Sequence, residues 1–148
     1  MPSWSEQELF EHMKQEPWFT PGAIAISREI MDWAGKRQQT STYWTGDKFP
    51  IFNASADSKR FISIMAKKGW DIEIPFYYKP QGYLLERAKN QQAIARLQRM
   101  GVKTVNPAPL SPDHRRAIKL DSVNPCLEEF LALLDWIVDE IYEESKLI

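Results

Sequence analysis

The sequence predicts an α+β fold, in which helices cover one face of a small, mostly antiparallel sheet of three to four strands. Helical patterns with capping residues occupy both ends of the 148-residue chain, and runs of β-branched and aromatic residues lie between them. A chain of this length is expected to form a single domain. We expect N-terminal helices in residues 1–35, the sheet in residues 36–80 and C-terminal helices in residues 81–148, in the order ααβββααα.

Two helices are expected before the sheet. Ser3 stands at capping-box spacing from a glutamate, which predicts a first helix near residues 4–15. Thr20 and Pro21 then form a capping residue followed by a first-turn proline, a common start of a helix. This second helix is expected to stop near Gly35, because glycine commonly terminates helices.

The middle of the chain is expected to supply the strands. A short, irregular strand is expected in the turn-rich residues 36–58. Residues 59–66, KRFISIMA, then form a β-branched and aromatic run of strand length. Lys67-Lys68-Gly69 predicts a hairpin turn after this run, because glycine adopts positive φ without strain.

The next stretch, WDIEIPFYY at residues 70–78, alternates apolar and polar side chains. A period of two places Trp70 and the isoleucines on the core face of a strand, and it places Asp71 and Glu73 in solvent. Pro75 has no backbone donor, so we expect an edge position or a bulge there. The cross-strand partners available to the two acids are Lys59, Arg60, Lys67 and Lys68.

Three helices are expected after the sheet. Residues 83–101 contain good helix formers and end at a glycine. In the Pro-rich connection that follows, residues 102–105 have the length of a very short strand, and residues 111–113, Ser-Pro-Asp, predict the start of a short helix. Asn124 precedes the last helix, in which apolar residues recur every three or four positions.

Charge is distributed unevenly along the chain. Residues 1–35 hold two basic (Lys/Arg) and six acidic (Asp/Glu) residues. Residues 36–119 hold sixteen basic and six acidic residues, and residues 120–148 hold one basic and eight acidic residues. The basic middle is either an open surface for phosphates or is neutralised by the acidic helices that flank it. No apolar run is long enough to span a membrane. The single cysteine permits no internal disulfide, and together these features lead us to expect a cytoplasmic protein.

Few residues offer catalytic chemistry, so an enzyme is not the leading expectation. Asp71 and Glu73 share a face of the predicted strand, which leaves a small metal-dependent hydrolase as an alternative. However, Pro75 occupies the position at which a restriction-type Glu-x-Lys motif has its lysine, and Lys79 lies about 20 Å from Glu73 along an extended strand. Cys126 is more typical of a small buried side chain than of a nucleophile. We expect neither a metal nor a cofactor.

Basic residues of the 83–101 helix and of the segment after it are the candidates for binding nucleic acid or another anion. Those in the helix share one face, and those in the segment follow a predicted helix N-terminus, and both arrangements suit phosphate groups. The candidate residues are Lys89, Arg96, Arg99, Arg115, Arg116 and Lys119. Tyr43, Trp44 and Tyr77 offer rings on which bases can stack, with packing in or beside the core as the alternative.

Four segments combine a Trp-x-Gly turn, a hairpin, a helix and a late Leu-Asp-Trp motif. They are IMDWAGKRQQTSTYWTGDKFPIFNAS, RFISIMAKKGWDIEIPFYY, ARLQRMGV and FLALLDWIVDEI. Together they cover most of residues 24–143 and resemble a small accessory domain that follows the catalytic domain in predicted restriction-type and other DNA-processing nucleases. That domain usually has further glycine and serine where this chain has Gly46-Asp47-Lys48-Phe49. The resemblance implies a non-catalytic module that works near nucleic acid or a protein partner, and it carries over no catalytic residue.

The leading hypothesis is therefore a non-catalytic binding module. It would contact nucleic acid, or a nuclease-type protein partner, through a basic central surface, and it would not involve a membrane. The alternative is a protein–protein interaction domain that forms a homodimer through its last helix. Leu133 and Trp136 lie off the main apolar stripe of that helix, where they either pack under a neighbouring element or form the dimer contact.

Overall fold

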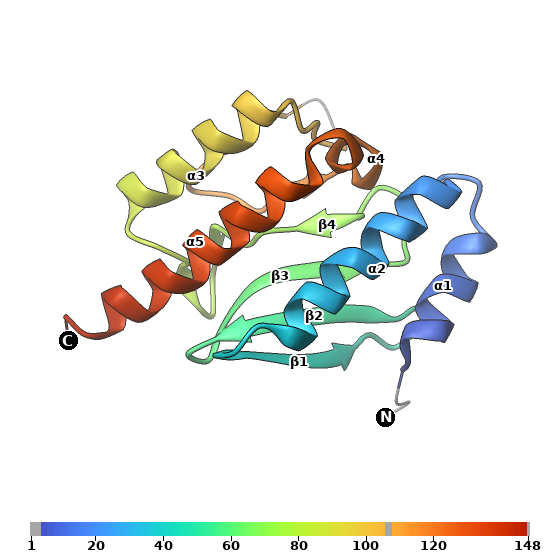
Figure 1. The fold of residues 1–148 in the computed structure, drawn as a ribbon, viewed down its shortest axis with the longest axis horizontal. Helices are drawn as coiled ribbons and strands as arrows, with labels where there is room; N and C mark the ends of the chain where they lie inside the picture. Colours follow the sequence, from blue (N-terminus) through green and yellow to red (C-terminus); the bar gives the residue numbers. More distant parts are fainter. Residues whose placement is uncertain (1–3, 106–107, 148) are drawn as a thin grey trace.

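The computed structural model describes residues 4–105 and 108–147, and it has helices packed on one face of an antiparallel sheet (Figure 1). The expected α+β fold is therefore confirmed, with five strands in the main sheet in place of three to four. The main sheet has the order β1-β2-β3-β4-β7, and β5 and β6 form a separate pair. The strands are Thr40–Thr45 (β1), Ile51–Ala56 (β2), Lys59–Met65 (β3), Ile72–Glu73 (β4), Tyr77–Tyr78 (β5), Gly82–Tyr83 (β6) and Ala117–Ile118 (β7).

Residues with positive φ make the turns between the first four strands. Asp57 and Ser58 alone separate β2 from β3, with φ of 50° and 66°, the left-handed values that a type I′ hairpin turn needs. Gly46 follows β1 with φ 104°, and a Cβ there would collide with the carbonyl oxygen of Phe49. Gly69 has φ 87° in the predicted turn between β3 and β4. These turns fix the register of the sheet.

The helices are Glu6–Lys14 (α1), Pro21–Lys36 (α2), Arg87–Met100 (α3), Leu120–Val123 (α4), the 3₁₀ turn Asn124–Cys126 (η1) and Leu127–Ser145 (α5). In Figure 1, α2 and α5 lie across the sheet, with α1 beside α2 and α3 beside α5. Their apolar faces and the inner face of the sheet form the core, where Ile30, Phe61, Ile64 and Leu134 are fully buried. None of the described helices is long and apolar enough to cross a membrane.

The ends of the helices confirm some of the predicted capping residues and not others. Thr20 caps α2 as predicted, with its hydroxyl accepting a backbone N–H at 3.0 Å, and Gly101 ends α3 with φ 86°. The predicted cap of α1 was wrong, because Ser5 accepts the N–H of Glu8 at 3.3 Å. Ser3 lies outside the described residues. The chain therefore uses a second Ser-x-x-Glu pair, two residues further on, for the same purpose.

The segment between α3 and α5 differs from the prediction. No helix begins at Ser111; Asp113 instead forms an ion pair with Arg87, with 2.8 Å between Oδ2 and Nη2. The chain then adds β7 to the main sheet, and α4 and η1 follow before α5. The short strand expected before this segment is reduced to a single bridge between Thr104 and Ile118.

The prediction for the stretch around β4 was partly wrong. Ile72 is buried as expected, but Trp70, predicted in the core, is 42% exposed. Asp71 and Glu73, predicted in solvent, are only 2% and 1% exposed. The alternation rule failed because it assumes a strand with one wet face. Here Asp71 is engaged by Trp18 and by the N–H of Leu120, and Glu73 is engaged by Arg60 and Arg115.

Candidate functional site

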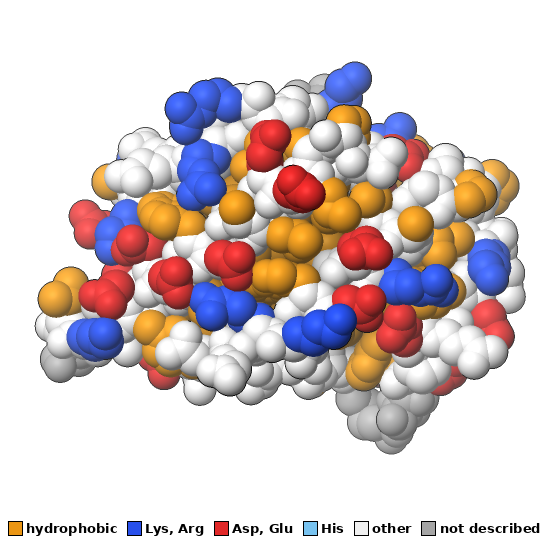
Figure 2. All heavy atoms as spheres, viewed as in Figure 1, with side chains coloured by type: hydrophobic (Ala, Val, Ile, Leu, Met, Phe, Trp, Pro, Cys, Tyr) orange, Lys and Arg blue, Asp and Glu red, His pale blue; other side chains and the backbone are white. Residues whose placement is uncertain are grey.

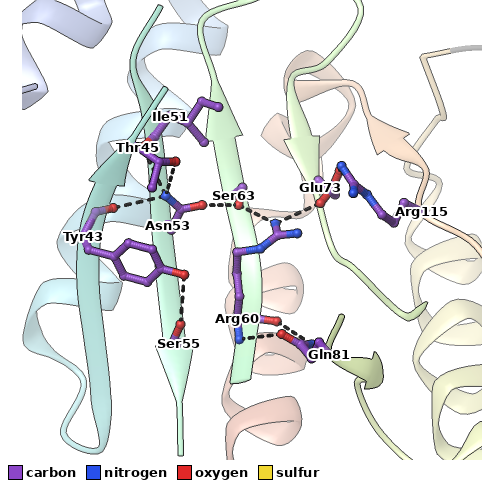
Figure 3. Close-up of polar contacts among 10 residues, drawn as sticks. All are labelled: Tyr43, Thr45, Ile51, Asn53, Ser55, Arg60, Ser63, Glu73, Gln81 and Arg115. Atoms are coloured by element: carbon purple, nitrogen blue, oxygen red, sulfur yellow. Dashed lines mark hydrogen bonds and ion pairs between the residues drawn. The ribbon is translucent and has the colours of Figure 1, made fainter. Parts of the chain in front are cut away.

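The face of the sheet that points away from the helices carries a row of polar side chains (Figure 3). The strand register aligns Tyr43 of β1 with Asn53 of β2, Ser63 of β3 and Glu73 of β4. Residues directly opposite each other in antiparallel strands point to the same face, so the four side chains form a line across the sheet. We call this surface, built on these four residues, the open face.

A β-bulge brings Arg60 to the open face. The pairing of β2 with β3 shifts between Ala54 and Ser55, so that Ser55 pairs with Arg60 and Phe61 becomes the extra residue. In a regular strand, residues three positions apart point to opposite faces. With the shift, the Arg60 Nη1 donates to the hydroxyl of Ser63 at 2.6 Å. The bulge thus places a guanidinium within the polar row.

Hydrogen bonds join the row into a chain. The side-chain amide of Asn53 donates to the Thr45 hydroxyl at 2.9 Å, and its carbonyl oxygen accepts from the Ser63 hydroxyl at 2.7 Å. Ser63 in turn accepts from Arg60, whose backbone exchanges two hydrogen bonds with the side chain of Gln81 at 3.0 and 3.1 Å. Such buried polar groups need partners, and the shared partners fix the positions of these side chains.

Glu73 lies at the centre of the cluster, between two arginines. Its Oε1 is 2.8 Å from Arg60 Nη1, and its Oε2 accepts from Arg115 Nε at 3.1 Å, with Arg115 Nη2 at 3.0 Å. A charge this deeply buried is tolerated when it is paired. Both guanidiniums also lie over the ring of Tyr78, with Cζ-to-centroid distances of 5.2 and 4.8 Å. Two cations share one carboxylate, so the cluster keeps a net positive charge.

A hollow of about 340 Å³ opens beside this cluster. Its polar floor is buried, whereas Tyr43 is 40% exposed and the side chain of Arg115 is 38% exposed. The hollow therefore presents an aromatic ring and a guanidinium to solvent. The lining residues are Tyr43, Thr45, Ile51, Asn53, Arg60, Ser63, Met65, Glu73, Tyr78 and Arg115.

One end of the sheet adds further cations. The β1–β2 and β3–β4 connections lie at the same end, because successive strands are antiparallel. Lys48 is exposed in the first connection, and Lys67 and Lys68 are exposed in the second. None of the three forms an ion pair with a residue that the structure describes. This end of the sheet therefore carries three exposed lysines together with the exposed Asp47.

Asp71 has a structural role that differs from the role of Glu73. It accepts from Trp18 Nε1 at 2.6 Å and from the N–H of Leu120 at 3.0 Å, so it joins the α1–α2 loop to the start of α4. Burial raises the pKa of Asp71, and the Leu120 hydrogen bond acts in the opposite direction. The carboxylates of Asp71 and Glu73 are thus both engaged by the protein's own donors.

The geometry gives the hydrolase alternative no support. Within residues 4–105 and 108–147, no three or more His, Cys, Asp or Glu side chains are grouped so that they could hold a metal ion. Cys126 is buried, and this burial raises the pKa of its thiol, which disfavours the reactive thiolate. The arrangement on the open face is suited to binding an anion or an aromatic group and offers no evident nucleophile with its base.

The predicted basic residues of α3 lie on the helix side of the molecule. Lys89 Nζ is 2.7 Å from Glu140 and 3.3 Å from Glu144 of α5, and the hydrogen bond to Glu140 raises the pKa of Lys89. Arg96 lies over the ring of Trp136, 5.6 Å from its centroid, and Arg99 is exposed. In Figure 2, which shows this side, basic and acidic side chains are interspersed. The charge of Lys89 is therefore neutralised by the acidic last helix, which was one of the two alternatives for the basic middle of the chain.

The other three predicted residues lie near β7, and their side chains have different partners. Arg115 belongs to the open face, as described above. Arg116 is half-buried, and its Nη1 donates to the carbonyl oxygen of its neighbour at 3.1 Å. Lys119 lies over Trp18, 5.2 Å from the ring centroid. The structure thus distributes the six residues over several places, and Arg115 alone joins the hollow of the open face.

Sequence reasoning missed Asn53, Ser63 and Tyr78, although a signal for the first two was present. Each is a lone polar residue of its type inside an apolar strand, IFNASA or KRFISIM, on the face away from the helices. Arg60 was recognised as a cross-strand partner for the acids, and it does pair with Glu73. The position of Arg60 beside Ser63 depends on the bulge, and no local sequence pattern predicts that bulge.

No protein-family model, no curated protein and no solved structure matches the chain.

Proposed function

We propose that the protein is a non-catalytic binding module whose open face contacts single-stranded nucleic acid. The observation that carries the proposal is the arginine pair, fixed by Glu73 and Tyr78 beside the exposed ring of Tyr43. Nucleic acid offers phosphates to guanidiniums and flat bases to aromatic rings, and both kinds of group meet in this one hollow. The resemblance to an accessory domain of DNA-processing nucleases favours the same class of ligand.

The shape of the surface favours a single strand over a duplex. An uncovered antiparallel sheet is a platform on which unpaired bases can lie flat against aromatic side chains. Tyr43 is available for such stacking, and Tyr77 and Tyr83, exposed by 36% and 41%, form a second ring pair with centroids 4.9 Å apart. The lysines at one end of the sheet, Lys48 and Lys67, would attract the phosphate backbone.

The arginines of the open face are better prepared for a ligand than Lys89 of α3. Glu73 and Tyr78 hold Arg60 and Arg115 in place, so less side-chain freedom is lost when a ligand binds. Lys89 would have to leave two carboxylates of α5 before it could contact a phosphate. The proposed site therefore lies on the open face and not on α3. Of the six basic residues predicted from the sequence, it includes Arg115.

The test is fluorescence anisotropy with a short fluorescein-labelled oligo(dT), titrated with protein at low and at high salt. We expect binding that weakens with salt, and we expect the Tyr43→Ala/Arg115→Ala variant to bind about tenfold more weakly or worse. Loss of one base–aromatic stack alone costs about 1–3 kcal/mol. Arg60 still pairs with the buried Glu73 in this variant, so the fold should be kept at some cost in stability, and circular dichroism checks the fold.

The matched control is Arg96→Ala/Arg99→Ala on α3, which should bind oligo(dT) nearly as well as the unmodified chain. Two results would refute the proposal: no binding at low salt, or equal affinity for the open-face variant and the unmodified chain. A labelled duplex of the same length is expected to bind more weakly, because its bases are not free to stack on tyrosine.

A further inference from the structure

No strand among the described residues pairs with the outer edge of β1. β1 is an end strand of the main sheet, and its described partner is β2 on one side only. Three consecutive residues in its middle, Ser41, Thr42 and Tyr43, are exposed, although they point to alternate faces. An edge strand of this kind presents backbone N–H and C=O groups that a further strand can bind.

The opposite edge of the sheet is protected. β7 is only two residues long, and the segment after α3 covers it. The N–H of Lys119 donates to the carbonyl oxygen of Lys103 at 2.8 Å, and the N–H of Val105 donates to the carbonyl oxygen of Ala117 at 2.9 Å. One edge is thus short and covered, whereas the other is six residues long and open.

The sequence of β1 lacks the features that usually protect an edge. Natural edge strands discourage pairing with lysine, proline, inward-pointing charge or a bulge. β1 reads TSTYWT, with no charge and no proline, and its register with β2 is regular over all six residues. Threonine, tyrosine and tryptophan are also among the residues that favour strands. The edge is therefore well suited to accept another strand.

We infer that β1 pairs antiparallel with β1 of a second copy of this chain, so that the two five-stranded sheets join into one. An uncharged strand brings no like charges together when it pairs with itself. Antiparallel pairing of identical strands also has two-fold symmetry, the commonest symmetry of homo-oligomers. The inference does not depend on nucleic-acid binding.

The two-fold axis fixes which side chains meet. The axis is perpendicular to the sheet, so both open faces lie on the same side, and a residue at the centre of the pair faces its own copy. Centring on Tyr43 places the two tyrosine rings opposite each other and sets Thr42 against Trp44 and Ser41 against Thr45. Aromatic–aromatic and aromatic–β-branched pairs of this kind stabilise antiparallel strands. We assign this register to the dimer.

In this dimer the two chains contact each other through β1, whereas the sequence suggested a contact through the last helix, α5. Leu133 is fully buried in the core, and Trp136 is half-buried beneath Arg96. Leu133 therefore packs in the core, and Trp136 packs against Arg96 of α3 in the same chain.

Light scattering coupled to size exclusion, over a range of protein concentrations, tests the dimer. We expect the mass of two chains for the unmodified protein and the mass of one chain for Tyr43→Lys, which sets two like charges directly opposite each other. Gln91→Lys, an exposed position on α3, is the matched control and should remain dimeric. A one-chain mass for the unmodified protein at all concentrations, or an unchanged dimer for Tyr43→Lys, would overturn the inference.

Disulfide trapping tests the register separately. Under mild oxidation, Tyr43→Cys should yield a covalent dimer, because the two sulfurs would face each other, whereas Thr42→Cys should yield much less. The native Cys126 is buried and should not contribute. Equal trapping at both positions, or more at residue 42, would contradict the assigned register. Neither readout involves nucleic acid, so failure here leaves the proposed function to its own test.

Discussion

Two sets of basic side chains, one on α3 and one on the open face, differ in how they meet acidic groups. Lys89 of α3 binds two carboxylates of α5 at the surface, and all three side chains are between 22% and 26% exposed. Arg60 and Arg115 share the carboxylate of Glu73, which is 1% exposed. On α3, acidic groups outnumber the lysine they bind, whereas on the open face the arginines outnumber the acid.

The net charge of a segment in the sequence does not show how much of that charge is neutralised in the folded protein. Residues 36–119 carry a large excess of Lys/Arg, yet part of that excess is neutralised by a helix that follows in the sequence. A single buried acid can orient two cations without cancelling both. The open face is therefore the better candidate for binding an anion, although α3 has the more regular pattern of basic residues.

The largest expected effect concerns the buried acid. Glu73→Gln removes the charge that Arg60 and Arg115 share and leaves two guanidiniums close together on the sheet. We expect the free energy of unfolding to fall by about 3 kcal/mol, the size of effect seen when one partner of a buried ion pair is removed. Urea unfolding followed by circular dichroism measures it.

Glu29→Gln is the matched control, since Glu29 is exposed on α2 and should change stability by about 0.5 kcal/mol or less. A change no larger for Glu73→Gln than for this control would show that the cluster on the open face is not held by its acid.

A smaller effect is expected for the basic residue of α3. Lys89→Ala breaks two partly exposed ion pairs with α5, and we expect a loss of about 1 kcal/mol or less. The loss should shrink further in high salt, which screens such pairs. The measurement is urea unfolding at two ionic strengths. A loss as large as that of Glu73→Gln would remove the contrast between the two regions.

The smallest expected effect is a pH dependence of the folding stability that comes from the surface ion pair of Asp113. The hydrogen bond from Arg87 lowers the pKa of Asp113 from 3.8 to about 2. The folded state thus favours the charged form, so this contribution to stability is complete above pH 3.8 and is lost as the pH falls toward 2. Asp113→Asn should flatten the pH dependence of urea unfolding in that range.

Arg87→Ala should flatten it similarly, because it removes the main cause of the lowered pKa of Asp113. If both variants followed the unmodified protein from pH 3.8 downward, the ion pair would have no part in acid stability.

Local rules predicted those parts of the fold that depend on a few neighbouring residues. The cap at Thr20, the stop at Gly101 and the turn at Gly69 are each decided by one side chain or by its absence. The class of fold followed from these signals together with the apolar patterns. The boundaries of β4 and the path of the chain before β7 depend on distant segments, so no local rule could supply them.

The candidate site was predicted only in part, for a reason that the residues around β4 make clear. Periodicity correctly separated Ile72 from Glu73 by face, but it equated the polar face with solvent. The burial of Glu73 depends on the bulge that moves Arg60 into reach and on Arg115, which lies 42 residues further along the chain. Pairings over such separations are set by the tertiary fold and are not visible in a window of sequence.

The carboxylate of Asp71 has a further consequence for the order in which the chain folds. Its two donors, on Trp18 and Leu120, are 53 and 49 residues away, on opposite sides of it in the sequence. Bringing such distant segments together loses much chain entropy before any contact compensates, whereas the β1–β2–β3 meander closes only short loops. We therefore expect the meander to form before the N-terminal helices dock against α4.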